Sequence, residues 1–295
     1  MSEPKKVGLV GVGIMGTAIA TRILECGHSL TVYDRNTDNV NAMVEKGAVA
    51  GTSAADVTAK SDFIIMSLNK ANIVEIVVFG QDGIAESGSA DKLLIDMSSI
   101  DPEATQQMSA RLLEQTGMPW VDCPLSGGAP GAYAGKLTIM AGGTQKDFDK
   151  SREVMDSLAA NMTLMGPSGA GQTTKLVNQV LCAITFQGIA EATQLALNGG
   201  VDIEKVPACL AGGRADSALL QEFMVKMGRK DYSPTGRIDN MLKDLESVQM
   251  FAMKTQTMMP ITTLTTEINR MFCAAGKGDN DSAALMKQFN GPADE

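Results

Sequence analysis

Three glycines near the start of the chain have the spacing of a phosphate-binding turn. They belong to Gly11-Val12-Gly13-Ile14-Met15-Gly16, which follows a short apolar run and precedes a segment with helical spacing at residues 17–26. Glycine permits a tight turn at Gly11, a close backbone approach to a pyrophosphate at Gly13, and close packing of helix on strand at Gly16. The start of the helix then stabilises the phosphate charge. The pattern alone is common, but its place between a strand and a helix indicates a phosphate-binding turn.

A carboxylate stands where a dinucleotide would place its adenosine ribose. Asp34 ends the second predicted strand, residues 30–34, and can accept hydrogen bonds from the ribose hydroxyls of NAD. Arg35 follows and could pair with the 2′-phosphate of NADP. Because Asp34 would repel that phosphate, we expect NAD to be preferred and NADP to be tolerated. The plainer alternative is an aspartate that only ends a strand.

Two further groups of residues could bind and convert a small acid. Ser126-Gly127-Gly128 follows a predicted strand at residues 120–123, and its backbone N–H groups suit a carboxylate, although a plain surface turn would look similar. Lys175 lies in the first turns of a long predicted helix, with Asn178 and Gln179 on the same face. Taken alone, Lys175 would be interpreted as an exposed helical lysine.

Other residues that could do chemistry are interpreted as structural. His28 is the only histidine of the chain and lies in a loop away from the predicted ligand edge, which argues against metal clusters and nucleophile–histidine systems. Lys243 lies in an ordinary amphipathic stretch and by spacing alone belongs to the surface. The five cysteines are scattered singly, as reduced and mostly buried thiols are.

The elements that must position these residues change character near residue 166. Before it, short apolar runs alternate with helical segments at residues 39–46, 72–79 and 102–116, which predicts a parallel sheet covered on both faces. After it, an apparent helix of residues 172–198 is followed by further helices. The predicted class is therefore α/β, with a Rossmann-type doubly wound domain at 1–166 and an all-helical domain at 167–295.

The net charge and the apolar content of the chain exclude some kinds of partner. The net charge of −9 would repel a nucleic acid, so we expect none as partner. The opening is too polar and the apolar run after it too short for a signal peptide, and no stretch of about 20 apolar residues is apparent. We therefore expect no membrane partner, and either a cytoplasmic location or a mature form after import. The long helix and the methionine-rich second half predict an interface in a homodimer or homotetramer.

Taken together, the motifs resemble those of the β-hydroxyacid dehydrogenase family nearly from end to end. Several ordered motifs at the family's spacing are far more specific than any one of them. The segments that carry the resemblance are residues 11–16, 34–36, 94–100, 122–128, 169–179 and 238–245.

The resemblance implies roles for individual residues. Lys175 would be the catalytic acid or base, and a small carboxylate-bearing aldehyde or hydroxy acid would be the substrate. The implied substrate residues are Ser126, Gly127, Gly128, Asn178 and Gln179, and the implied cofactor residues are Gly11, Val12, Gly13, Ile14, Met15, Gly16, Asp34, Arg35, Leu68, Ser99 and Lys243. This revises the surface interpretation of Lys243.

At two places this chain differs from the pattern of many family members, which affects the cofactor loop and the choice of substrate. Many members have Pro-Asn where this chain has Asn69-Lys70 after Leu68, which affects the loop on the adenosine side. Many also have Asn where Gln179 stands; Gln there resembles the tartronate semialdehyde reductase branch and favours reduction of that aldehyde to glycerate. The alternatives are 3-hydroxyisobutyrate, sulfolactaldehyde, threonate, succinic semialdehyde or glyoxylate, and, outside enzymes, a non-catalytic cofactor-binding scaffold.

Overall fold

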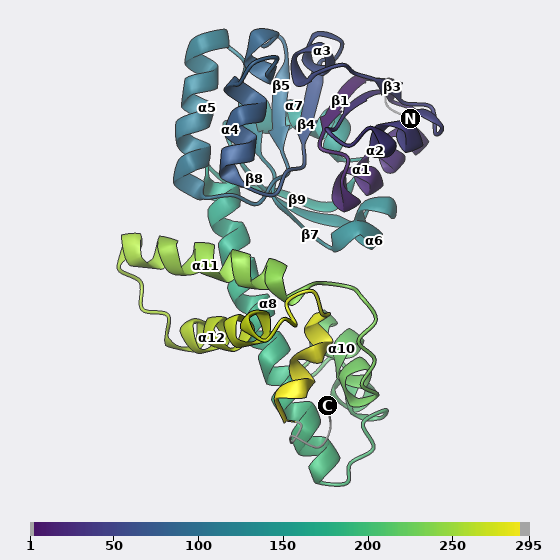
Figure 1. Ribbon diagram of the computed structural model, residues 1–295, viewed down its shortest axis with the longest axis vertical. Coiled ribbons are helices and arrows are strands. Elements are labelled where there is room, and N and C mark those ends of the chain that lie inside the picture. Colours follow the sequence, from purple (N-terminus) through teal and green to yellow (C-terminus); the bar gives the residue numbers. More distant parts are fainter. Residues whose placement is uncertain (1–2, 290–295) are drawn as a thin grey trace. The chain divides into compact units, whose positions relative to one another are not determined.

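The computed structural model describes residues 3–289 and divides into two compact units, residues 1–175 and 176–295 (Figure 1). The first unit contains the sheet, and the second is helical, so the predicted fold class is confirmed. The predicted domain boundary at 166 falls between the last strand and the long helix that follows it. That boundary stays a prediction.

One sheet organises the first unit. Its order is β3-β2-β1-β4-β5-β6-β8-β7, with β9 paired to β8. The strands from β3 to β6 are parallel, whereas β8 runs antiparallel to β6 and β7. The strand bounds are β1 Lys6–Val10, β2 Ser29–Tyr33, β3 Val49–Ala50, β4 Phe63–Met66, β5 Leu93–Asp96, β6 Trp120–Asp122, β7 Leu125–Ser126, β8 Leu137–Gly142 and β9 Ala159–Gly166.

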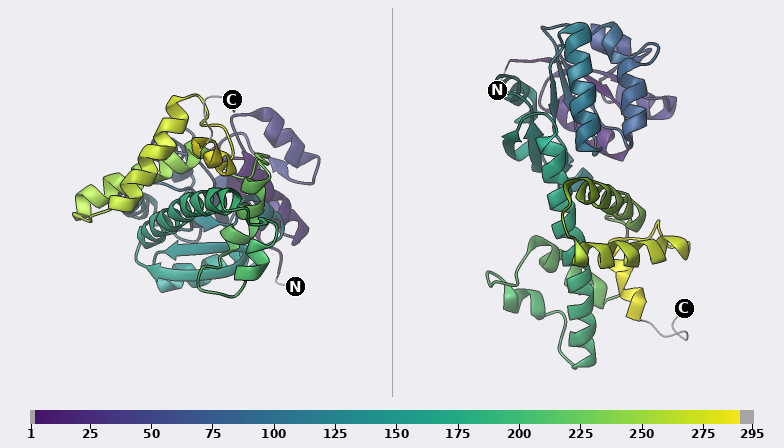
Figure 2. Two further views of the ribbon diagram at one scale, coloured as in Figure 1. Left: turned by 90° about the horizontal axis from the view of Figure 1, so that it is seen from below. Right: turned by 90° about the vertical axis from the view of Figure 1, so that its left-hand side faces the viewer.

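Helices cover both faces of this sheet because alternate strand residues point to opposite sides. Ile65 and Ile95 pack with α1, α2, α6 and α7, and Ile64 and Leu94 pack with α3, α4 and α5. Helices α4 and α5 lie side by side on their face (Figures 1 and 2). The bounds are α1 Ile14–Glu25, α2 Thr37–Val44, α3 Ala54–Ala59, α4 Ala71–Phe79, η1 Ile84–Glu86, α5 Pro102–Thr116, α6 Gly128–Tyr133 and α7 Gln145–Met155.

Local signals explain which helices the sequence predicts well. Helix α5 begins and ends as predicted because Asp101 caps it, a proline follows at its first position, and Gly117 ends it with a left-handed backbone. Ser126-Gly127-Gly128, for which a plain surface turn was the alternative, is the end of β7 followed by the start of α6. Strand β9 was not predicted, because its residues alternate between half-buried and exposed and carry a weak apolar signal.

The second unit packs around the long helix α8, Ala170–Asn198, which begins in the first unit. Its other helices are α9 Val206–Leu210, α10 Ala218–Gly228, α11 Ile238–Thr255, α12 Pro260–Ala274 and η2 Ser282–Phe289. Phe186 of α8 and Phe223 of α10 meet edge to face at 4.7 Å between ring centroids at the centre of the core. Helices α11 and α12 form a hairpin (Figures 1 and 2).

Helix α8 bears on the expectation that no apolar stretch of about 20 residues is present. By length and composition alone, α8 is long and apolar enough to cross a membrane, and among the described residues it is the one helix of that kind. Residue types alone did not indicate such a helix. Apolar Phe186 and polar Gln172 of this helix are both buried, but only 33% of its apolar window is buried.

The described cysteines are all free, as predicted, but only Cys123 is buried; Cys209 is exposed and the other three are half-buried. The expectation that the thiols are mostly buried is therefore wrong.

Candidate active site

Most of the predicted cofactor residues follow the carboxyl ends of neighbouring parallel strands. Gly11 follows β1, Asp34 follows β2, Leu68 comes shortly after β4, and Ser99 shortly after β5. Strands β2, β1, β4 and β5 are adjacent and parallel, so these residues lie along one edge of the sheet. This is the edge at which open parallel sheets bind ligands.

The glycine turn between β1 and α1 has the shape that a pyrophosphate needs. Gly11 has φ of +95°, and a Cβ on Gly16 would lie 1.9 Å from the Gly11 carbonyl oxygen, so both positions require glycine. A Cβ on Gly13 would meet no atom within 4 Å. Gly13 is the N-cap of α1, and the first N–H groups of a helix have no partner within the helix.

Asp34 joins the glycine turn to the end of β2. Its Oδ2 accepts a hydrogen bond from the Val12 N–H at 2.7 Å, and its Oδ1 accepts one from the Asn36 N–H at 2.8 Å. A carboxylate has about four acceptor positions, so Asp34 keeps capacity for ribose hydroxyls. Arg35 beside it is exposed. These residues fit a dinucleotide cofactor.

The loops after β4 and β5 are tied to each other and to the glycine turn. The Leu68 N–H donates to Ser98 Oγ at 3.0 Å, and a Cβ on Gly11 would lie 2.9 Å from Leu68 Cδ2. The predicted cofactor residues Leu68 and Ser99 are therefore on neighbouring loops of one edge.

Ser126, Gly127 and Gly128 connect β7 to α6. Gly127 and Gly128 both have positive φ, +119° and +60°, which explains why glycine stands at both positions. Both are exposed, and Gly127 is the N-cap of α6 without a side-chain cap bond. That this turn binds a carboxylate stays a prediction.

A buried pair of carboxyl groups, which the sequence interpretation did not include, lies beneath this edge. Asp96 and Asp122 are directly paired in the register of β5 and β6, and both side chains are fully buried. Burial raises the pKa of Asp96 to about 7, against hydrogen bonds from Ser98 that lower it, and the charge of Asp122 adds to the rise. Burial likewise raises the pKa of Asp122 and, with these two charges, that of the Cys123 thiol. The available signal was an aspartate ending each of two apolar runs.

Asp122 also holds the start of α8. Its Oδ1 accepts from the Gly169 N–H at 2.8 Å, and its Oδ2 accepts from the Gln172 N–H at 3.0 Å. The carboxylate thus serves as a cap supplied by another part of the chain for N–H groups that a helix start leaves without an intrahelical partner. Lys175 is half-buried and lies three residues after Gln172.

In the second unit, three of the predicted residues belong to one polar cluster. Asn178 Nδ2 donates to Gln179 Oε1 at 2.9 Å, and Gln179 Nε2 donates to Asp244 Oδ2 at 2.5 Å. Lys243 Nζ lies 3.2 Å from Asp244 Oδ1. Asp244 therefore links α11 to α8, a role that the sequence interpretation missed although it stands next to Lys243.

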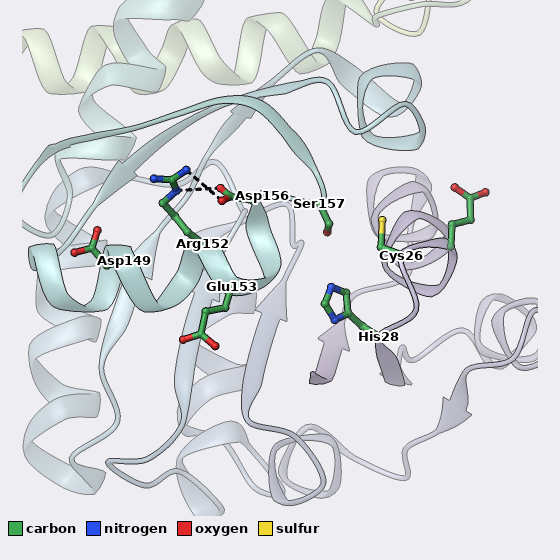
Figure 3. A pocket seen from close by; sticks show the side chains of 8 residues that line it. Cys26, His28, Asp149, Arg152, Glu153, Asp156 and Ser157 are labelled. Carbon is green, nitrogen blue, oxygen red and sulfur yellow. Dashed lines mark hydrogen bonds and ion pairs between the residues drawn. The ribbon is translucent and has the colours of Figure 1, made fainter. Parts of the chain in front are cut away.

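A pocket of about 740 Å³ in the first unit lies away from this edge (Figure 3). His28 lines it just before β2, at the amino end of the sheet, together with α7 residues such as Asp149 and Arg152. The imidazole is buried, its Nδ1 accepts from the Lys5 N–H at 3.2 Å, and burial with the Lys5 charge lowers its pKa. We assign this pocket no part in the candidate site.

Comparisons with known proteins agree with this geometry. Residues 6–166 match the family of the NAD-binding domain of 6-phosphogluconate dehydrogenase, and residues 169–289 match that described as NAD-binding of NADP-dependent 3-hydroxyisobutyrate dehydrogenase. The chain is 33% identical over 282 residues to 2-hydroxy-3-oxopropionate reductase of Escherichia coli strain K12, covering 96% of each chain. It is 32% identical over 288 residues to 2-(hydroxymethyl)glutarate dehydrogenase of Eubacterium barkeri, covering 97% of this chain and 95% of that one.

Among solved structures, 3-hydroxyisobutyrate dehydrogenase of Mycobacterium tuberculosis with L-serine superposes with a TM-score of 0.89 over 98% of this chain and 100% of that chain. At 24% identity this likeness shows the fold alone. The fold, the glycine turn and the matches to known families together define the class of this protein. It is an NAD(P)-dependent hydroxyacid dehydrogenase. The chain belongs to the β-hydroxyacid dehydrogenase family, as the sequence motifs indicated.

Proposed function

We propose that this protein reduces tartronate semialdehyde to glycerate, with Lys175 as the proton donor. The observation that carries the proposal is the place of Lys175 in α8, one turn after the buried anchor at Asp122 and Gln172, together with Gln179 in its polar cluster. The similarity to the Escherichia coli 2-hydroxy-3-oxopropionate reductase supports the same substrate.

In this proposal each group of residues has one task. Ser126, Gly127 and Gly128 hold the carboxylate of the substrate through hydrogen-bond donors, which orients the aldehyde. A reduced nicotinamide supplies a hydride to the aldehyde carbon when it is bound. Lys175 gives one ammonium proton to the carbonyl oxygen, so the aldehyde becomes a primary alcohol, and the lysine regains its proton from solvent.

The remaining predicted residues act on orientation and cofactor binding. Asn178 and Gln179 orient the substrate, and Lys243 lies near the nicotinamide in this proposal. Asp34 favours NAD over NADP by repelling a 2′-phosphate, with Arg35 allowing some use of NADP. We further propose that the active form is a cytoplasmic homodimer or homotetramer.

A second substrate class has its own support. The similarity to 2-(hydroxymethyl)glutarate dehydrogenase favours a hydroxymethyl acid with a larger side group, for which 3-hydroxyisobutyrate is the simplest relative by chemistry. Tartronate semialdehyde has a hydroxyl group on C2, where the aldehyde of 3-hydroxyisobutyrate has a methyl group. A panel of aldehydes with and without that hydroxyl distinguishes them.

The decisive experiment compares Lys175→Ala with wild type. We expect turnover to fall by about 10²- to 10⁴-fold, because proton transfer is lost, while binding of NADH, measured by fluorescence titration, is unchanged. Lys205→Ala, at a lysine whose side chain is 82% exposed, is the matched control and should keep full activity. Wild-type turnover by Lys175→Ala would reject Lys175 as proton donor.

The substrate panel is run on the same proteins with NADH and NADPH. Selective turnover of tartronate semialdehyde with NADH is expected. Turnover confined to 3-hydroxyisobutyrate and its semialdehyde would reject the proposed substrate while leaving the role of Lys175 intact.

A further inference from the structure

Gln172 is a buried amide at the start of α8 that the predicted set of site residues did not include. It is the third residue of the helix and only 1% exposed. A buried amide must find partners for its donor and its acceptor, since leaving either unsatisfied costs free energy. The partners of Gln172 therefore indicate what the residue is for.

Both partners of the side chain are backbone groups on either side of Ser99. Gln172 Oε1 accepts from the Ile100 N–H at 3.2 Å, and Gln172 Nε2 donates to the Ser98 carbonyl at 2.8 Å. These two hydrogen bonds fix the backbone on both sides of Ser99. They do not depend on the side chain of Ser99. The amide thus acts as a clamp on the loop after β5.

The backbone of Gln172 is held as well. Its N–H donates to Asp122 Oδ2 at 3.0 Å, and the neighbouring Gly171 is so close to β8 that a Cβ there would lie 2.4 Å from the Met140 carbonyl oxygen. The first turn of α8 is therefore fixed to the ends of β6 and β8, and through the Gln172 side chain to the loop after β5.

Lys175 follows one turn later on the same stiff helix, where residues three apart are neighbours on the surface. We propose that Gln172 is a positioning residue, which fixes the spacing between the Ser99 backbone and Lys175. This rests on the proposed function, in which Lys175 supplies the proton, and on the cofactor role that the family resemblance implies for Ser99. Without the two hydrogen bonds of the Gln172 side chain, the Ser99 backbone and Lys175 would both be present but misplaced relative to each other.

The test compares Gln172→Met with Gln187→Met. Gln187 is also a buried glutamine of α8, 8% exposed, with side-chain bonds to Glu191 and Gln288, so the same substitution there removes comparable contacts far along the helix. We expect kcat of Gln172→Met to fall by about 10- to 100-fold, since small misplacements at a reacting centre have such effects, with KM for the aldehyde changed much less. Gln187→Met should lose thermal stability but keep its kcat.

A second variant covers the case in which Gln172→Met does not fold. Gln172→Glu keeps the size and the acceptor for the Ile100 N–H, but can donate to the Ser98 carbonyl only when protonated. The ratio of its kcat to that of wild type should rise as the pH falls. The buried carboxyls Asp96 and Asp122 lie near this position and are present in both proteins, so the pH profile of wild type is measured in parallel.

Three results overturn the inference. Equal kcat for Gln172→Met and Gln187→Met, or a Gln172→Glu ratio that does not change with pH, rejects the clamp alone, provided that Lys175→Ala is inactive in parallel. Full activity of Lys175→Ala rejects the proposed function and the clamp with it.

Discussion

At the scale of single residues, two side chains of the same type in the candidate site have different surroundings. Asp34 and Asp96 both stand at or just after the end of a parallel strand. Asp34 is half-buried and accepts from two backbone N–H groups, whereas Asp96 is sealed beneath the edge and its Oδ2 has no hydrogen-bond partner. The first is suited to bind a polar ligand, and the second to hold a proton.

The proton on Asp96 makes stability depend on pH in a defined direction. Its pKa is about 7 in the folded chain and 3.8 in the absence of the fold, so between these values the folded state binds more protons than the unfolded state. The stability contributed by the protonated group is therefore fully present below about pH 4 and is lost as the pH rises towards 7. At about 1.4 kcal/mol per unit, the shift corresponds to roughly 4 kcal/mol.

Asp96→Asn tests this at the residue scale. The amide cannot ionise, so the melting temperature of the variant minus that of wild type should rise between about pH 5 and about pH 8. Asp38→Asn, at an exposed position of α2, is the control and should show a constant difference. A constant difference for Asp96→Asn as well would contradict a proton held by Asp96.

At the scale of elements, the turn between β1 and α1 separates folding from binding within one motif. Gly16 is needed by the fold, since any Cβ there would overlap the Gly11 carbonyl oxygen. Gly13 is not needed by the fold, since a Cβ there would enter open space beside the start of α1. The same residue type is thus required for two different physical reasons.

The pair Gly13→Ala and Gly16→Ala tests that separation. Gly13→Ala should keep the wild-type melting temperature but weaken NADH binding by about tenfold or more, because a methyl group occupies the place of a pyrophosphate. Gly16→Ala should lower the melting temperature by an amount corresponding to about 1–3 kcal/mol of overpacking. Unchanged NADH affinity in Gly13→Ala would show that the cofactor does not approach this turn.

At the scale of the whole molecule, α12 buries mostly polar residues and exposes several apolar ones. Its buried side carries Thr262, Thr265, Thr266 and Asn269 together with Phe272. Its exposed side carries Ile261, Leu264 and Met271, which are 58%, 62% and 69% exposed and follow a helical spacing. Exposed apolar patches of this kind mark interfaces, which supports the proposed homo-oligomer.

Light scattering on wild type and on Leu264→Glu/Met271→Glu tests the oligomer. Wild type should have two or four times the mass of the chain, and the double variant should shift towards the monomer, because charges do not bury in an apolar interface. Leu113→Glu, at a 54% exposed leucine of α5 in the first unit, should leave the mass unchanged. A monomeric wild type would reject the homo-oligomer altogether.

Residue types at short spacing were enough to predict the features that local chemistry specifies. The glycine turn, the cap and end of α5, the alternation of strands and helices and the family all follow from residue types at short spacing, because turns, caps and apolar periodicity act within a few residues of the chain. The place of Asp34 at the carboxyl end of a strand follows from the same reasoning.

The contacts between distant segments could not be predicted from residue types and are seen only in the folded chain. Asp122 and Gly169 are 47 residues apart, Gln172 and Ser98 are 74 apart, and Gln179 and Asp244 are 65 apart. A glutamine on a helix or an aspartate after an apolar run has the same local pattern whether it faces water or a buried partner. Its role depends on which strand ends and helix turns the folded chain brings together, and short-range patterns contain no information about that pairing.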